Sequence, residues 1–143
     1  MRLSQLIYYS KRKSYDPRVL EDILRSSRRN NEKLGITGAL LVQDKYFFQL
    51  LEGPRDTLSE LLSVIMKDER HEQLVLVLFE ELNYRIFSNW RMAHLSDQDA
   101  TVQKIYKFFT ADISSPSMLP GFVAWAMIDQ MSTEVLGGHK GDA

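Results

Sequence analysis

The 143-residue sequence contains no cysteine, which excludes disulfides, thiolate metal sites and cysteine nucleophiles. This composition is typical of proteins that fold in a reducing cytoplasm. No apolar stretch is long enough to span a bilayer, and the segment that follows Met1 is too short and too polar for the core of a signal peptide. We therefore expect a cytoplasmic protein that has no membrane partner.

An excess of charge of one sign is also lacking, because 18 Lys and Arg residues face 19 Asp and Glu residues. A formal net charge of -1 gives no overall attraction to nucleic acid or to an anionic membrane. Histidine is scarce as well. His71, His94 and His139 lie near a predicted helix end, near a predicted strand end and near the C-terminus. We therefore expect no metal site and no nucleic-acid partner.

The residues that are present alternate between short strands and amphipathic helices. Apolar runs predict strands over residues 3–10, 36–42, 46–52, 73–79 and 90–95. Apolar residues at helical spacing predict helices over residues 17–31 and 54–71, a third from about residue 96 to 109, and a fourth over 122–131. Asp16 followed by Pro17 is typical of a helix start, and Gly35 of a helix end.

The first strand is apolar on both faces, with Leu6 and Tyr8 on one and Ile7 and Tyr9 on the other. Such a strand needs cover on both sides. We therefore predict an α+β fold with a ferredoxin-like βαββαββ mixed sheet, two helices on one face and two C-terminal helices on the other. Residues 73–79 should form an internal strand, because the run is almost continuously apolar.

We expect residues 1–95 to form a core and residues 96–134 to form a helix pair that belongs to the same domain. Residues 135–143 should be a disordered tail. A length of 143 residues is typical of one domain with a single core.

Three polar residues interrupt the apolar pattern. Gln49 lies in a strand among apolar neighbours, Asn31 extends the apolar stripe of the first helix, and Tyr8 lies in the first strand. Each has an ordinary explanation: a core amide bonded to backbone, a helix-terminal Asn, and a core Tyr whose hydroxyl finds an acceptor. On the predicted fold, however, all three could converge between the first two helices.

The space between those helices would be lined by Ile23, Leu24, Leu61 and Ile65. An apolar slot with a few convergent polar groups is typical of a small-molecule site. Because the polar groups are uncharged amides and a hydroxyl, they suit a planar heteroaromatic ligand better than a phosphate or a metal.

Six segments together resemble one known family. They are LIYYS at 6–10, SRRNN at 27–31, GITGAL at 35–40, FFQLLEG at 47–53, DERH at 68–71 and FSNWRM at 87–92. Their order and spacing over residues 3–95 resemble those of BLUF domains, which are sensors of blue light using FAD. The remainder resembles the C-terminal helix pair of short, stand-alone BLUF proteins.

The resemblance implies a flavin, FAD or else FMN or riboflavin, between the first two helices. Asn31 would bond the pyrimidine edge of the ring, and Gln49 would bridge the ring's N5/O4 edge and the hydroxyl of Tyr8. Asp68 and Arg70 would approach the flavin's polar tail. The remaining residues implied at the flavin site are Ser27, Ile23, Leu24, Ile65 and His71. One departure is Val64, where many relatives carry a polar residue.

The implied function is that of a blue-light photoreceptor that catalyses no reaction of its own. Light would rearrange the hydrogen bonds of Tyr8 and Gln49, either by rotation or by tautomerisation of the Gln49 amide, and shift the flavin spectrum slightly to the red. Trp90 and Met92 would relay the signal to the C-terminal helices. We expect the signal to leave by protein–protein contact, through a homo-oligomer or a separate effector protein.

Other functions are possible on a ferredoxin-like fold. An enzyme of the acylphosphatase kind would need a phosphate loop, and residues 35–38 lack the lysine that follows one. An RNA-recognition domain would need an RNP pattern, which is absent. The remaining alternative is a regulatory or ligand-binding domain without photochemistry.

Overall fold

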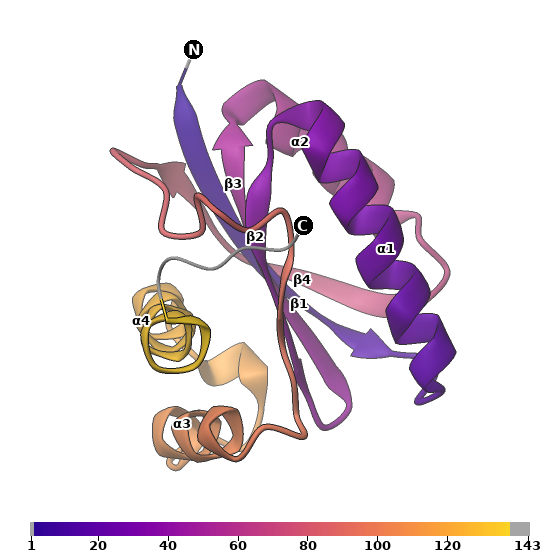
Figure 1. Ribbon diagram of the computed structural model, residues 1–143. Helices are drawn as coiled ribbons and strands as arrows, with labels where there is room; N and C mark the ends of the chain where they lie inside the picture. Colours follow the sequence, from indigo (N-terminus) through magenta and orange to yellow (C-terminus); the bar gives the residue numbers. More distant parts are fainter. Residues whose placement is uncertain (1, 138–143) are drawn as a thin grey trace.

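The computed structural model describes residues 2–137. A twisted five-stranded sheet lies between two layers of helices (Figure 1). The strands are β1 (Leu3–Arg12), β2 (Thr37–Gln43), β3 (Tyr46–Pro54), β4 (His71–Glu81) and β5 (Ala93–Leu95). The helices are α1 (Pro17–Leu34), α2 (Arg55–Met66), α3 (Ala100–Thr110) and α4 (Gly121–Met131), with the short turns η1 (Pro116–Met118) and η2 (Ser132–Leu136).

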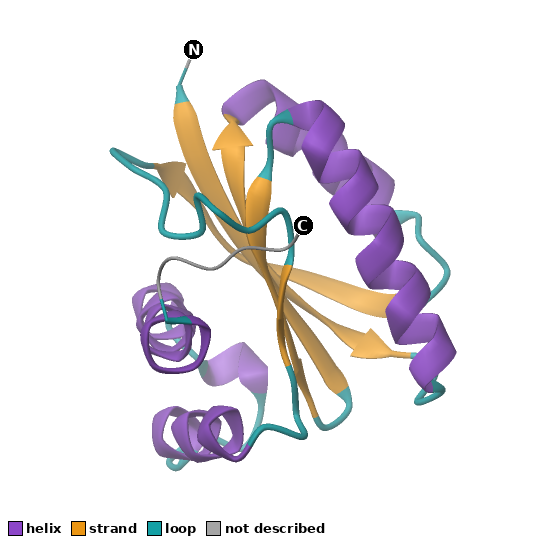
Figure 2. Ribbon diagram, in the orientation of Figure 1, coloured by secondary structure: helices purple, strands orange, loops and turns teal. Residues whose placement is uncertain are grey.

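The strand order is β4-β1-β3-β2-β5, and the sheet is mixed. β1 pairs antiparallel with β3 and β4, β2 pairs antiparallel with β3, and β5 runs parallel to β2. Helices α1 and α2 cover one face, whereas α3 and α4 lie on the other (Figure 2). The predicted fold class is confirmed.

The two faces of β1 belong to two separate cores. Leu6 and Tyr8 pack with the α1 and α2 layer, and Ile7 and Tyr9 pack with α3 and α4. All four side chains are buried, as expected for a strand whose residues alternate between two covered faces. This alternation directs Tyr8, and not Tyr9, toward α1 and α2.

Helix α1 begins at Pro17 and is capped by Gly35, as the sequence predicts. It ends at Leu34, three residues beyond the predicted last residue Asn31. The Asp16 side chain accepts a hydrogen bond from the backbone of Arg18, and Pro17 occupies the first turn. Gly35 ends the helix with a φ of 69°, a left-handed conformation that favours glycine, and its N–H donates to the carbonyl of Asn31. Asn31 is thereby fixed in the last turn.

Strand β4 differs from the prediction, because it is an edge strand and not an internal one. Its apolar residues serve two cores: Leu74 and Phe79 pack with the α1 and α2 layer, and Val77 and Leu78 with the α3 and α4 layer. Val75 and Leu76, which lie between these residues, are 42% and 45% exposed, so a continuous apolar run does not show that a strand is internal.

Three other boundaries differ. His71 opens β4 and does not end a helix. β5 spans only Ala93–Leu95, so Trp90 and Met92 lie in the loop that precedes it. Val135 and Leu136, which we assigned to the tail, lie in η2 and pack against the core; residues 138–143 of that tail lie outside the described residues.

Within residues 2–137, no helix combines the length and the apolar character needed to cross a membrane.

Gly38 on β2 lies so close to the backbone of β3 that a residue with a Cβ atom would collide with it. A Cβ at this position would lie 2.1 Å from the carbonyl oxygen of Leu50, whereas a Cβ on Gly53 would meet a side-chain carbon of Ile36 at 3.1 Å. We expect Gly38→Ala to lower the free energy of unfolding by about 1–3 kcal/mol or more, because backbone must move. Urea denaturation will measure this loss, and Gly53→Ala is the matched control. Equal losses in the two variants would contradict the expectation.

Candidate functional site

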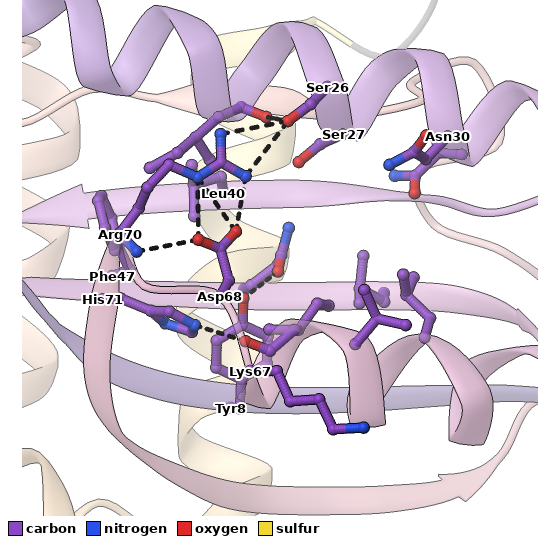
Figure 3. A pocket seen from close by; sticks show the side chains of 17 residues that line it. Tyr8, Ser26, Ser27, Asn30, Leu40, Phe47, Lys67, Asp68, Arg70 and His71 are labelled. Atoms are coloured by element: carbon purple, nitrogen blue, oxygen red, sulfur yellow. Dashed lines mark hydrogen bonds and ion pairs between the residues drawn. The ribbon is translucent and has the colours of Figure 1, made fainter.

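A cavity of about 470 Å³ opens between α1, α2 and the sheet (Figure 3). Its volume lies within the range of about 300–1,000 Å³ that is typical of small-molecule sites. The sheet, helix α1, helix α2 and the segment from the end of α2 to the first residue of β4 each contribute side chains. They are Tyr8, Leu40, Phe47, Gln49 and Leu51; Ile23, Ser26, Ser27, Asn30 and Asn31; Leu61, Val64 and Ile65; and Lys67, Asp68, Arg70 and His71.

Tyr8 and Gln49 form a buried pair at the sheet side of this cavity. They are direct partners in the β1–β3 register, so their side chains stand on the same face. The Tyr8 hydroxyl donates a hydrogen bond to Oε1 of Gln49. Burial, and then the charge of Asp68, raise the pKa of the Tyr8 phenol far above its ordinary value of 10.0. Tyr8 therefore keeps its proton at neutral pH and acts as the donor.

The other end of the Gln49 amide has a weaker partner. Its Nε2 group donates to the thioether sulfur of Met92 at 3.4 Å, and a thioether is a poor acceptor. Gln49 is thus held firmly at its oxygen and loosely at its nitrogen. An amide bonded in this asymmetric way can exchange its nitrogen partner at small cost.

Asn31 is buried at the C-terminal end of α1, with an exposed fraction of 2%. Its Nδ2 group donates to the carbonyl of Arg91 at 2.7 Å, which joins α1 to the loop before β5. The Asn31 backbone carbonyl accepts from the N–H groups of Gly35 and Ile36. Asn31 therefore lines the cavity while holding the loop that carries Trp90 and Met92.

A charged cluster lies at one end of the cavity. The Arg70 guanidinium holds the Asp68 carboxylate at 2.6 Å from Nη2 and 3.0 Å from Nε, and it reaches Ser26 on α1 at 3.4 Å. Figure 3 shows Arg70 bridging from Asp68 toward Ser26. The side-chain hydrogen bond from Arg70 lowers the pKa of Asp68 below 3.8. With Lys67 nearby, this end can bind polar or anionic groups.

His71 is buried behind Tyr8, with the two ring centroids 6.1 Å apart. Nδ1 contacts the Ser10 hydroxyl at 2.6 Å and Nε2 contacts the carbonyl of Ile65 at 2.7 Å. A carbonyl can only accept, so the neutral ring carries its proton on Nε2 and accepts at Nδ1. His71 thereby links the start of β4 to β1 and to the end of α2.

The two residues of the implied relay occupy different places. Met92 is fully buried in the α1 and α2 core beside Gln49. Trp90 does not line the main cavity; it packs against the α3 and α4 core. Trp90 also borders a second depression of about 390 Å³ that includes Asn31 and Arg91.

The structure brings most of the expected site residues together. Every residue predicted to bind the cofactor lines the cavity except Leu24, which is buried in the core below it. The cavity takes Ile23, Ser26, Ser27, Asn30 and Asn31 from α1, whereas Leu24 on the same helix packs into the core with Leu6 and Leu58.

Sequence reasoning missed several lining residues: Ser26, Asn30, Leu40, Phe47, Leu51 and Lys67. Phe47 and Leu51 could have been found, because strand alternation places them on the face of Gln49. Ser26 and Asn30 are four residues apart on α1 and share one side of it. Lys67 gives no such signal.

Comparison with known proteins shows which family has this fold and this set of residues. Residues 3–93 match the family model of BLUF, sensors of blue-light using FAD. The chain belongs to the BLUF family. Blue-light reception, the function that the sequence predicted, is therefore the function of its family.

The relatives include the blue light- and temperature-regulated antirepressor BluF of Escherichia coli, which is 30% identical over 109 residues, 73% of this chain and 27% of the relative. Photoactivated adenylate cyclase subunit beta of Euglena gracilis is 29% identical over 93 residues, 63% of this chain and 11% of the relative. The chain thus spans about a quarter or less of these two relatives.

Among solved structures, BlsA in its photo-activated state superimposes with a TM-score of 0.80 at 26% identity, covering 90% of this chain and 93% of BlsA. The BLUF protein BlrB in its dark state gives a TM-score of 0.72 at 31% identity, covering 90% and 96% of the two chains. The likeness extends past the family match at residue 93, since 90% of the chain is covered. Among residues 2–137 of this BLUF chain, no cluster of His, Asp and Glu could hold a metal ion.

The Asp68–Arg70 pair gives a prediction about pH. Since the folded pKa of Asp68 lies below its unfolded value of 3.8, the pair stabilises the fold above about pH 4 and loses this effect as the pH falls. We expect Asp68→Asn to lower the free energy of unfolding by no more than about 1 kcal/mol at pH 7, because the pair is partly exposed and solvent screens it, and by less at pH 3. Urea denaturation at both values measures the effect, with exposed Asp112→Asn as control. A loss that is equal at pH 3 and pH 7 would refute it.

Proposed function

We propose that this BLUF chain is a blue-light photoreceptor that binds FAD in the cavity between α1 and α2, with Tyr8 and Gln49 as its photoactive pair. FMN or riboflavin, which share the same ring system, are alternatives to FAD. The observation that carries the proposal is the hydrogen bond from Tyr8 to Gln49 inside a cavity of ligand size. The alternative is a regulatory or ligand-binding domain without photochemistry, and the colour of the protein separates the two.

The lining residues suit a flavin. Ile23 of α1 and Ile65 of α2 offer apolar surface to a planar ring, and the amides of Asn31 and Gln49 offer donors and acceptors to carbonyl and nitrogen edges. Ser27 and His71 complete the inner lining, and Leu24 supports the wall from the core.

Asp68 and Arg70 lie where a polar tail or ring edge would need charged partners. Apolar Val64 leaves Asn31 as the main polar anchor on the helices.

A bound flavin supplies absorption of blue light and, when excited, a strong oxidant. Tyr8 is an oxidisable side chain whose proton already points at Gln49. Transfer of an electron from Tyr8 to that oxidant, and of the phenolic proton through the Gln49 amide to the reduced ring, would remove the hydrogen bond that holds Oε1. Gln49, whose nitrogen has only a thioether partner, could then rotate or tautomerise and present a different end to the ring.

The change in Gln49 is passed on through Met92. Met92 contacts the Gln49 amide and directly precedes β5, and β5 leads to α3. A bond lost or gained at Met92 would shift the balance between two positions of β5 and the C-terminal helices. Trp90 takes part from the same loop.

We infer that the signal leaves by contact with a second copy of the chain or with a separate effector protein, in the cytoplasm. Phe108 on α3 and Phe122 on α4 are each 76% exposed, and exposed aromatic side chains are typical of contact surfaces. The adenylate cyclase activity in the name of the Euglena relative is not carried over, because only 11% of that protein is matched. We propose that this chain acts as a sensor and not as an enzyme.

Purified protein should be yellow and should show a reversible red shift of its flavin absorption under blue light. Tyr8→Phe removes the donor to Gln49, and Gln49→Leu removes the amide, so each should abolish the red shift while flavin remains bound. Absorption spectra before and after illumination measure this. Tyr9→Phe is the matched control, because Tyr9 faces the opposite core. A colourless protein that takes up no flavin, or a normal photocycle in either variant, would overturn the assignment.

Light should also change the dynamics of the chain beyond the cavity. Because Met92 connects Gln49 to β5, amide hydrogen exchange in residues 90–131 should differ between light and darkness. The expected change is a severalfold difference in exchange rate in β5 and at the start of α3, measured by mass spectrometry. A Gln49→Leu sample treated in the same way is the control. Identical exchange beyond residue 90 in light and darkness would contradict a route through β5.

A further inference from the structure

A second polar site lies in the same strand as Gln49, three residues further along β3. Glu52 has an exposed fraction of 0%. Its Oε1 accepts from the N–H of Phe87 at 3.0 Å and from the Thr37 hydroxyl at 2.9 Å, and its Oε2 accepts from the N–H of Ile86 at 2.7 Å. A buried carboxylate is tolerated only when donors of this kind surround it.

Arg85 closes the arrangement from the outside. Nη1 of its guanidinium donates to the Thr37 hydroxyl at 2.9 Å and to the backbone carbonyl of Glu52 at 3.2 Å, and Nη2 donates to the carbonyl of Gly35 at 2.8 Å. Burial raises the pKa of Glu52, and the hydrogen bonds from Ile86, Phe87 and Thr37, with the positive charge of Arg85, oppose that rise. We call this set the Glu52 clamp: Glu52, Thr37, Arg85 and the N–H groups of Ile86 and Phe87.

The clamp holds the beginning of the loop whose end reaches the photoactive pair. Phe87 accepts from the N–H of Trp90 at 2.9 Å, and the Trp90 carbonyl accepts from the N–H of Gly38 at 3.0 Å. The loop then passes Arg91, whose carbonyl is bonded by Asn31, and arrives at Met92 beside Gln49. Residues 86–92 are therefore attached to β3 twice, through Glu52 at one end and Gln49 at the other.

We propose that Glu52 is a positioning residue. Its clamp holds the loop so that Trp90 and Met92 lie where they respond to the change in Gln49. The proposal rests on the proposed photoreceptor function. Glu52 is not among the residues that line the cavity, and its carboxylate bonds Thr37 and the N–H groups of Ile86 and Phe87, so it acts on the output and not on the light reaction itself. Because Arg85 also bonds the Gly35 carbonyl, the clamp holds the loop and the end of α1 in one fixed relation.

The Glu52→Gln variant tests the clamp with little change of volume. Both carboxylate oxygens of Glu52 accept hydrogen bonds from backbone N–H groups, and a Gln side chain replaces one of those oxygens with a second donor. At least one N–H of Ile86 or Phe87 then loses its acceptor. Thr37→Val removes one donor and keeps both backbone bonds, so its effect should be smaller. Glu80→Gln on β4 is the matched control. Within residues 2–137, the Glu80 carboxylate accepts a hydrogen bond from the Gln5 side chain and from no backbone N–H.

The measurement is hydrogen exchange of the flavin-loaded protein in darkness and in light, together with absorption spectra. In Glu52→Gln we expect exchange at residues 86–92 to rise at least tenfold in darkness, with the red shift retained and the light-induced change at residues 93–110 reduced severalfold. Glu80→Gln should behave as the wild type. Unchanged exchange at residues 86–92, or an undiminished light-induced change at residues 93–110, would overturn the proposal.

A variant that misfolds and a wild type that shows no photocycle can each be distinguished from failure of the clamp. If Glu52→Gln does not fold, Arg85→Met is measured instead, since Arg85 is only partly buried and its loss should raise exchange at the same residues. If the wild type shows no photocycle, the proposed function fails, and dark exchange still decides whether Glu52 holds the loop.

Discussion

The hydrogen bond between Tyr8 and Gln49 is the interaction on which the rest of the site depends. It forms because β1 and β3 pair in one register, with residue 8 opposite residue 49 on the face that α1 and α2 cover. A shift of that register by one residue would turn every side chain of one strand to the opposite face. The apolar neighbours on both faces, Leu6 and Leu51 on one and Ile7 and Leu50 on the other, make such a shift very unfavourable. Two cores thus fix the position of one hydroxyl group.

Strand β3 has a central place in both space and chemistry. It lies in the middle of the sheet, presents Gln49 to the cavity, and presents Glu52 to the loop before β5. Because both groups project from one well-paired strand, the distance between the Gln49 amide and the Glu52 carboxylate is fixed by backbone geometry. The loop itself has little regular structure and is held by these two attachments together with the bonds from Asn31 to Arg91 and from Gly38 to Trp90.

The two helix layers contact different parts of the molecule. α1 and α2 line the ligand cavity, and the Gly35 cap of α1 places Asn31 against the loop at Arg91. α3 and α4 cover the opposite face, where Trp90 packs. The short segment from Trp90 to β5 therefore passes from one core to the other, since Met92 belongs to the α1 and α2 core. A change at Gln49 has a physical path across the sheet through only a few residues.

The helices, most strands and the face of each strand could be predicted from local sequence, because hydrophobic periodicity and caps such as Asp16 and Gly35 need only neighbouring residues. The sequence also identified Tyr8, Asn31 and Gln49 as polar residues in apolar surroundings, and the six segments that place the chain in the BLUF family. Three features required the folded chain: β4 lies at an edge, β5 is three residues long, and Met92, not Trp90, contacts Gln49. The tertiary structure also revealed Glu52, whose acceptors serve donors 34 and 35 residues away in the chain. Strand order and buried polar pairing depend on contacts between distant segments. The local pattern of apolar and polar residues does not show which of these segments will contact one another.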